Sequence, residues 1–590
     1  MPALARLART SAVGALSVKA GPAVSCAADG LLTLAAGARA TAYDTRCGAA
    51  PTNLPDLVKR NRASREQADL TALGRSLTRH GDCLTATGPL ASLVTGRYDS
   101  GSTAVAPSTP GSPSPAPPCA VTVLTSTGVG GSGAARRSGA SDADSLVARA
   151  DAARPAGSTL LVLGISEAAG DDVAHLHVAL AAGPGFPTGA LVSSSTRRDG
   201  YVQLIDVAPT LLQLVGATVP TAISGQPFRV QGADPTRAQL IDVDLRATVQ
   251  KRVTVPWFVV TIGVVLLLLA ARRTRRTSAV AAVALPASSF LAGLIPWWRA
   301  AHPLLALLGV TGGLSLVLGL AAVSLARYRR TPDEGWAAAA GLCALTALVL
   351  IGDLLTGAHL QITSVTGYSP LVAGRFAGIG NVAFGVYAAA GLLATGWLAR
   401  GRLWVVVVCG LLLVAVDGAP PWGSDVGGVL ALLPALVLLG LLVTGRRVSS
   451  TRLGLAGLAG ATLVTAAALL DHTRGPTAQT HLGRFVTQVE DGSARGVLQR
   501  KADAVLGLLF HSPVTALLPL VVAGAVYLLL RPPPALRDAF TTATGLRHGL
   551  VALSLACALG FALNDSGAAV PALALLVALP VATAASARPG

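Results

Sequence analysis

Charged residues are scarce in this chain. Of its 590 residues only 13% are Asp, Glu, Lys or Arg, whereas 52% are hydrophobic, and the mean hydropathy is +0.60. Soluble globular domains carry about 25% charged residues. The deficit excludes an ordinary soluble enzyme and indicates that much of the chain lies in lipid, where charge is costly.

Acidic residues are few even among the charged ones. The chain has 46 Lys and Arg against 29 Asp and Glu, which gives a net charge of +17. In a nucleic-acid-binding protein the basic residues cluster on one face of a soluble domain, whereas here they separate long apolar runs. We therefore expect no nucleic-acid partner and interpret the basic residues as signals of membrane topology.

The first part of the chain, up to about Gln250, lacks any apolar run of the ~20 residues needed to cross a bilayer. Short β-type runs alternate there with helix-like stretches such as 142–152, which predicts an α/β domain over residues 1–250. The β-type runs are 120–126, 159–166 and 176–183.

Large apolar side chains are missing from residues 99–118, a stretch rich in Ser, Pro and Gly. Such a composition does not bury enough apolar surface to offset the entropy of ordering. We expect a flexible insertion at this position in the α/β domain.

From Val255 onward, in contrast, apolar runs recur almost without pause. We count about eleven potential spans, which predicts an all-α polytopic transmembrane bundle over residues 251–590, in contact with the lipid bilayer. The runs are 255–271, 278–296, 303–325, 336–356, 381–399, 403–417, 426–444, 453–470, 512–530, 548–563 and 567–586.

Basic residues divide the loops of this bundle into two sets. If the first span runs from outside to inside, one set of loops holds Arg272, Arg273, Arg275, Arg276, Arg327, Arg329, Arg330, Arg400, Arg402, Arg446, Arg447, Arg452, Arg531, Arg537, Arg547 and Arg588. The opposite set holds only Arg299, Arg375, Arg474, Arg484, Arg495, Arg500 and Lys501. The positive-inside rule makes the first set cytoplasmic, so we expect a plasma-membrane protein with an extracytoplasmic domain 1–250 and a cytoplasmic C-terminus.

An exported domain needs a targeting signal, yet residues 1–20 contain no apolar core of adequate length and no convincing cleavage site. We expect the true start, with a leading helix, to lie upstream of Met1. The alternative is that the first span acts as a late signal.

Zinc-type cysteine spacing is also absent, since no Cys-x-x-Cys or Cys/His pattern occurs. Four cysteines fall in the predicted outer domain, and an oxidising compartment allows them two disulfides in any of three pairings. Unpaired, buried thiols are the alternative. These cysteines are Cys26, Cys47, Cys83 and Cys119.

The run GYVQLIDVAPTLLQLVGATVP (200–220), followed by SGQPF (224–228), resembles the C-terminal part of the alkaline phosphatase and sulfatase superfamily. The start MPALARLARTSAVGALSV also resembles a helix near the beginning of such domains. The resemblance implies an alkaline-phosphatase-like α/β fold over most of residues 1–230. The residues that match its helix motif are Asp206, Pro209, Thr210, Leu211, Leu212 and Gly216.

The metal motifs of that superfamily are not intact in this chain. An Asp-His pair expected after one strand is replaced by Ser166 and Glu167, and an Asp ligand of the first strand would lie upstream of Met1. Two-metal chemistry needs several carboxylate and His ligands and a nucleophile. The resemblance leaves Thr33 or Cys26 as nucleophile candidates and Asp29 as a metal ligand, but we expect a degenerate domain in which His175 and His177 are structural.

Polar side chains at the outer ends of apolar spans are functional candidates, because packing in lipid does not require them. They gather at 351–385, 420–428 and 471–501, within or next to the predicted outer loops 357–380 and 471–511. As catalytic candidates we select Arg375, Asp425, His481 and Arg484. As substrate-binding candidates we select Asp353, His359, Asn381, His472 and Arg474.

These residue types suit an anionic, lipid-linked glycan. Arg binds phosphate bidentately, His moves protons, and Asp acts as a base or counter-ion. The alternative is that these side chains only snorkel to the interface and cap loops. The pattern identifies no cofactor and no metal.

An exported phosphatase-like domain fused to a polytopic bundle resembles a group of actinobacterial cell-envelope membrane proteins. We therefore predict a role in envelope assembly, as an outer-face transferase or hydrolase acting on a lipid-linked glycan. Two alternatives stay open: a flippase of envelope precursors, and a scaffold with a pseudoenzyme outer domain. Charged residues deep within spans are few, which disfavours a proton-coupled carrier.

Overall fold

The structure is a computed structural model that divides into two compact units. Unit 1 comprises Met1–Thr248 and Pro370–Phe376, and unit 2 comprises Val249–Ser369 together with most of the chain after Ala377. The structure describes all residues except 44–46, 48–50, 52, 96–118, 127, 169–172, 272–273, 332, 475–480, 491, 493–517, 564–567 and 588–590. The predicted insertion at 99–118 therefore lies outside the described residues.

Unit 1 is built on a mixed sheet whose strand order is β4-β5-β1-β6-β8, with β7 also paired to β1. β1 runs antiparallel to β5 and parallel to β6 and β7. A second, parallel pair joins β2 and β3. The strands are β1 (Ala12–Ser17), β2 (Leu84–Thr87), β3 (Val121–Leu124), β4 (Leu160–Leu163), β5 (Leu176–Ala182), β6 (Gly189–Ser193), β7 (Tyr201–Gln203) and β8 (Phe228–Val230).

Helices cover the sheet of unit 1, in agreement with the predicted α/β class. They include α5, which contains the predicted helical stretch 142–152, and α6, which carries most of the Asp-x-x-Pro-Thr-Leu-Leu motif. All three predicted β-type runs contain strands, namely β3, β4 and β5. The helices are α1 (Pro2–Ala8), α2 (Ala27–Ala36), α3 (Leu54–Ala63), α4 (Ala72–His80), α5 (Gly133–Ala153) and α6 (Val207–Leu214).

The central strand β1 is buried on both faces because its side chains alternate between two apolar layers. Leu16 packs into the cluster that contains Leu32 of α2 and Leu212 of α6. Val13 packs on the opposite face with Leu7 of α1, in a cluster that Val147 of α5 borders. Every residue of β1 is buried, so this strand lies at the centre of the fold.

A long-range helix cap holds α1 against α5. The Asp144 carboxylate accepts hydrogen bonds from the backbone N–H groups of Ala3 (3.1 Å) and Leu4 (2.9 Å). Burial alone would raise the pKa of Asp144, but the two backbone hydrogen bonds and the nearby Arg6 outweigh it and lower the pKa below its ordinary value.

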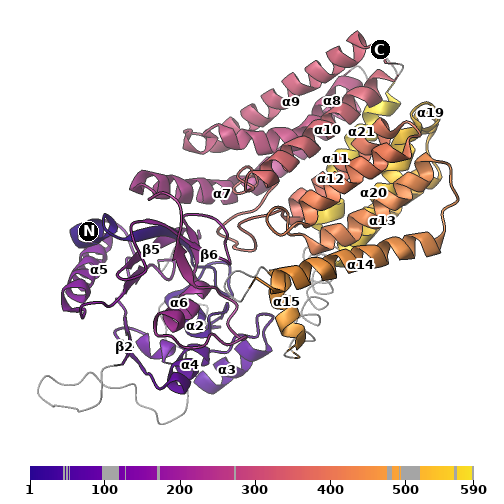
Figure 1. Ribbon diagram of the computed structural model, residues 1–590. Helices are drawn as coiled ribbons and strands as arrows, with labels where there is room; N and C mark the ends of the chain where they lie inside the picture. Colours follow the sequence, from indigo (N-terminus) through magenta and orange to yellow (C-terminus); the bar gives the residue numbers. More distant parts are fainter. Residues whose placement is uncertain are drawn as a thin grey trace, which may run out of the picture. The chain divides into compact units, whose positions relative to one another are not determined.

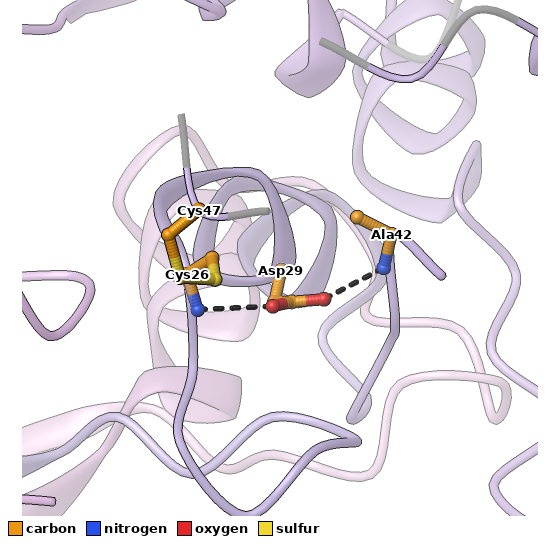
Figure 2. Close-up of a disulfide and its surroundings, with 4 residues drawn as sticks. All are labelled: Cys26, Asp29, Ala42 and Cys47. Carbon is orange, nitrogen blue, oxygen red and sulfur yellow. Dashed lines mark hydrogen bonds between the residues drawn. A yellow bond between two sulfur atoms is a disulfide. The ribbon is translucent and has the colours of Figure 1, made fainter. Parts of the chain in front are cut away.

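Two disulfides join the four cysteines of unit 1. Cys26 pairs with Cys47 (Cα–Cα 5.1 Å; Figure 2) and Cys83 pairs with Cys119 (Cα–Cα 4.7 Å). Pairing is thus confirmed, and one of the three possible connectivities is selected. The first bridge contradicts the suggestion that Cys26 is a nucleophile, because a disulfide sulfur carries no thiolate.

Unit 2 is helical. Among the described residues nine helices are long and apolar enough to cross a membrane, which identifies a multi-pass membrane protein. They are α7 (Arg237–Ala270, which begins in unit 1), α8 (Arg275–Leu291, extended to Leu294 by a 3-10 turn), α9 (Pro303–Tyr328), α10 (Glu334–Leu355), α11 (Asn381–Ala399), α13 (Val426–Val443), α14 (Ser450–His472), α20 (Thr544–Leu563) and α21 (Ala569–Ser586).

Two of the eleven predicted runs are not among these nine helices. The run at 403–417 forms α12 (Leu403–Gly418), a helix of 16 residues, and the described part of the run at 512–530 forms α18 (Leu518–Leu530), of 13 residues. Helix α12 is shorter than the ~20 residues that span a bilayer without adjustment, whereas residues 512–517 of the other run lie outside the described residues. Unit 2 also contains α15 (His481–Glu490) and α19 (Pro534–Thr542).

Helix α11 is the most buried of the candidate spans and packs against α10, α12, α20 and α21 (Figure 1). Glycines permit these close approaches. A Cβ on Gly396 would lie 2.7 Å from the Gly545 carbonyl oxygen, and one on Gly385 would lie 2.5 Å from that of Val570. Such small-residue contacts are typical of helix packing in membranes.

Candidate functional site

The segment Pro370–Phe376 belongs in sequence to the loop between α10 and α11, yet it packs as part of unit 1. Ser17, the last residue of β1, donates a hydrogen bond from its hydroxyl to the Pro370 carbonyl oxygen at 2.8 Å. Leu371 is buried in an apolar cluster with Ala15 and Leu176. The end of the central strand therefore fixes the start of the segment.

Two arginines of unit 1 bind the rest of the segment. Arg39 donates from its guanidinium to the Ala373 carbonyl oxygen. Arg198 donates from Nε to the Phe376 carbonyl oxygen at 2.7 Å. Arg375 lies between these two carbonyls in the chain and is partly exposed, so the segment presents it from a fixed backbone.

Tyr201 and Arg246 complete the surroundings of the segment. The Tyr201 ring lies 6.2 Å from the Phe376 ring, measured between centroids. Arg246, in the first part of α7, interacts electrostatically with Tyr201, with Arg198 and with Asp242.

Arg39 and Arg198 thus contact the segment that holds Arg375, and Arg246 interacts electrostatically with Arg198. We call the residues Arg39, Arg198, Arg246 and Arg375 the arginine cluster. Burial lowers the pKa of Arg39, Arg65 adds to this effect, and Glu66 opposes it. Since an arginine stays protonated at any physiological pH, burial concentrates the field of these cations. Such a cluster is suited to an anion with several oxygens.

Of the predicted residues whose side chains the structure describes, only Arg375 belongs to the arginine cluster. Asp353 is buried in the last turn of α10, where it accepts hydrogen bonds from the Leu360 N–H (2.6 Å) and from Gln361 Nε2 (3.2 Å). Gln361 in turn accepts from the Gly380 N–H at 3.3 Å. Asp353 therefore fastens the α10–α11 loop.

The other two candidates of this loop lie at its edges. His359 is exposed, and Asn381 is the first residue of α11 and partly buried.

Asp425 lies beside a second buried carboxylate that sequence analysis missed. It is the N-cap residue of α13, and its backbone N–H donates to the Asp417 carbonyl oxygen at 3.0 Å. A Cβ added at Gly428 would lie 2.3 Å from Asp417 Oδ2 and 2.9 Å from Asp425 Oδ2. Because both oxygens are this near to one point, they lie close to each other. Both side chains are at least 96% buried, at 0% and 4% exposure.

The third predicted group surrounds the connection from α14 to α15. Asp471 is buried, accepts from the Gly483 N–H at 2.9 Å, and lies 3.6 Å from the guanidinium of Arg474. His472 lies 3.6 Å from the Glu490 carboxylate. The side chains of His481 and Arg484 lie outside the described residues, so their predicted catalytic role stays a prediction.

In unit 1, the residues that the superfamily resemblance suggested as a nucleophile or a metal ligand make structural contacts. Asp29 accepts from the N–H groups of Cys26 (2.9 Å) and Ala42 (2.7 Å), as Figure 2 shows. The hydroxyl of Thr33 is buried and bonds to the backbone of Ala40. These contacts give Asp29 and Thr33 a role in joining α2 to the chain that follows it.

Asp206 is completely buried and accepts four hydrogen bonds of 2.7 to 3.0 Å. The donors are the hydroxyls of Ser193 and Ser195 and the N–H groups of Gln203 and Gln226. Burial raises the pKa of Asp206, and the four hydrogen bonds oppose this shift. The motif residue thus connects β6, β7 and the SGQPF segment.

His175 and His177 both pair with carboxylates, which supports the structural role predicted for them. His175 Nδ1 lies 3.0 Å from Asp244, and His177 Nε2 lies 3.1 Å from the buried Glu167. Within the described part of the chain, no group of three or more His, Cys, Asp or Glu side chains is arranged to hold a metal ion.

Sequence analysis missed most of the arginine cluster. Arg39 did carry a signal, since it is the only charged residue in the run LLTLAAGARATAY, and a charge within such a run needs a partner when it is buried. Arg198 and Arg246 lie in polar stretches, so their sequence surroundings did not single them out as candidates.

Comparison of the chain with protein-family models, with curated proteins and with solved structures found no match.

Proposed function

We propose that this chain is an integral plasma-membrane protein of cell-envelope biogenesis that handles an anionic, lipid-linked glycan at the outer face of the membrane. In this proposal unit 1 is extracytoplasmic and the arginine cluster binds the phosphate or pyrophosphate of the substrate. The observation that carries the proposal is that Arg39 and Arg198 donate to the segment that holds Arg375, while Arg246 interacts electrostatically with Arg198.

The orientation is supported by two independent features. The distribution of basic residues between alternate loops follows the positive-inside rule with unit 1 outside. The two disulfides of unit 1 are also typical of an oxidising compartment.

The chemistry of the cluster supports an oxyanion as the ligand. Guanidinium groups bind phosphate through paired, charge-assisted hydrogen bonds, each worth about 1.5–3 kcal/mol. Arg39 and Arg198 each donate to a backbone carbonyl, and a guanidinium carries five N–H donors in all.

A degenerate phosphatase-like domain fits the same proposal. The resemblance of residues 200–228 to the alkaline phosphatase and sulfatase superfamily suggests descent from a phosphoester-binding fold, while Asp206 and Asp29 serve hydrogen bonding within the domain. We propose that unit 1 retained anion binding without the two-metal chemistry.

The proposal is tested by mass-spectrometric profiling of lipid-linked envelope intermediates in cells depleted of this protein, with the leaflet of each intermediate assigned by accessibility to an impermeant reagent. Depletion is expected to cause one intermediate to accumulate on the outer leaflet. Complementation with the wild type or with Arg137→Gln, an exposed arginine of α5, should restore the profile, whereas Arg375→Gln should not. An unchanged profile on depletion would contradict the proposal and favour a scaffold.

A second candidate function, a proton-coupled flippase, rests on the buried carboxylates Asp417 and Asp425. Ionisable groups buried among membrane helices often serve proton relays. In that case Asp417→Asn should cause an intermediate to accumulate on the inner leaflet, while Arg375→Gln would leave transport intact. Accumulation on the outer leaflet alone would exclude this alternative.

A further inference from the structure

Unit 2 contains an apolar groove of about 160 Å³ that none of the preceding functions uses. Its walls come from α7, α8 and α21, with Val386 of α11 and Thr366 of the α10–α11 loop. The only polar side chains among the described residues that line it are Thr261 and Thr366. No charged side chain of the described chain borders the groove.

The groove opens sideways from the helical unit. Ile262 and Leu266 of α7 both line it and are 38% and 55% exposed, so its edge faces the medium around the helices. For membrane-spanning helices that medium is lipid hydrocarbon.

Aromatic and proline side chains form the inner wall of the groove. Trp257 is buried, its indole N–H donates to Thr311 Oγ1 at 3.2 Å, and its ring packs edge-on against Phe258 with centroids 5.1 Å apart. Pro286 in α8 and Pro580 in α21 line the groove from the interior of their helices. A preformed cavity of this kind reduces the entropic cost of holding a chain.

One end of the groove is bordered by hydroxyls. Thr366 hydrogen-bonds with Ser289 and lies 3.3 Å from the Ser364 hydroxyl. The hydroxyl of Thr261 makes no hydrogen bond to any other residue that the structure describes. Hydroxyl groups without a nearby cation match the ester carbonyls of a glycerolipid, whereas a prenyl phosphate would place its phosphate directly beside its chain and require a cation.

We infer that this groove holds one acyl chain of a bilayer glycerolipid, with the ester end of the chain next to Thr261 and Thr366. The ligand is distinct from the anionic substrate proposed above, and this inference does not depend on that proposal. The bound lipid fills the space between α7 and the helices beside it.

The experiment measures the glycerolipid that remains bound to the full-length protein after purification in dodecyl maltoside and extensive washing. Leu285→Trp fills the groove from α8, and Leu267→Trp, on a 73% exposed position of α7 that does not line the groove, is the matched control. Because the indole occupies the space of the chain, Leu285→Trp should retain less glycerolipid than Leu267→Trp after the same washing. Equal retention in the two variants would overturn the inference, as would a prenyl lipid in place of the glycerolipid.

A second measurement does not depend on the folding of Leu285→Trp. The protein is reconstituted into nanodiscs of phosphatidylcholine with brominated acyl chains, which quench indole fluorescence on contact. Trp257 is 3% exposed in the protein alone, so a chain in the groove should quench it, and the quenched fraction should fall in Trp257→Phe. Identical quenching of the wild type and of Trp257→Phe would contradict an acyl chain at this position.

Discussion

Replacement of Asp206 by alanine tests whether the first residue of the Asp-x-x-Pro-Thr-Leu-Leu motif has a structural role. In the wild type the carboxylate accepts from two hydroxyls and two backbone N–H groups. The hydroxyls of Ser193 and Ser195 lie 2.8 Å apart and can bond to each other, but the N–H groups of Gln203 and Gln226 have no such freedom. Each buried donor left unsatisfied costs about 1–3 kcal/mol, so we expect a loss of about 4 kcal/mol.

Hydrogen exchange followed by mass spectrometry on the full chain measures this loss in unit 1 without requiring two-state unfolding of the whole protein. Peptides that cover β1 and β6 should exchange nearly 10³-fold faster in Asp206→Ala, because each 1.4 kcal/mol of lost stability raises the exchange rate about tenfold. Asp142→Ala, an exposed position on α5, is the control and should not change them. An acceleration below about tenfold would refute the structural role that we assign to Asp206.

The cap of α1 and the close packing around Gly428 lead to two more predictions. Asp144→Ala should destabilise α1 by about 1 kcal/mol, measured by exchange, while Asp142→Ala has no effect. Because the pKa of Asp144 is lowered in the folded state, its carboxylate should stabilise α1 above the unfolded-state pKa of about 3.9, and this stabilisation should be lost as the pH falls through the folded-state pKa. If the stability of α1 changed with pH in Asp144→Ala as it does in the wild type, the result would contradict this. Gly428→Ala should lower the resistance of the purified protein to denaturant by about 1–3 kcal/mol, because its Cβ would clash with two carboxylates. Gly454→Ala, whose Cβ would meet nothing within 4 Å, should instead be neutral or stabilising by up to about 1 kcal/mol, and equal effects of the two would disprove the clash.

Local patterns predicted much of unit 1. The runs that became β3, β4 and β5 were recognisable because β-type apolar segments alternate with polar, helix-like ones. The even number of cysteines allowed two bridges, but not which ones, since connectivity depends on contacts that spacing does not encode. That Cys26 is not a nucleophile became clear only from its disulfide with Cys47.

The candidate site was less predictable because it depends on contacts between residues far apart in sequence. Arg375 stood out as a basic residue in a loop set with few of them. Arg39 and Arg198 meet its segment from 334 and 178 positions away, measured to Ala373 and Phe376. A local sequence pattern does not predict a contact between residues so far apart.

In the helical unit the apolar runs located the spans, but not the polar groups that are buried between them. The run at 403–417 ends in Asp417, which the sequence analysis did not select. Its role beside Asp425 depends on the turn between α12 and α13, where Gly423 donates to the Val416 carbonyl oxygen at 2.9 Å and reverses the chain. Tertiary packing therefore decides what a charge at a span end does.

The central claim, that the arginine cluster binds the anionic group of a lipid-linked substrate, is tested most directly by one binding measurement. The full-length protein in phosphatidylcholine nanodiscs is titrated with a short-chain polyprenyl phosphate, and Kd is compared among the wild type, Arg375→Gln and Arg137→Gln. We predict a Kd about tenfold or more higher for Arg375→Gln, from the loss of a charge-assisted pair of about 1.5–3 kcal/mol, and no change for Arg137→Gln. The same Kd for all three proteins, or no binding to the wild type, would contradict the account.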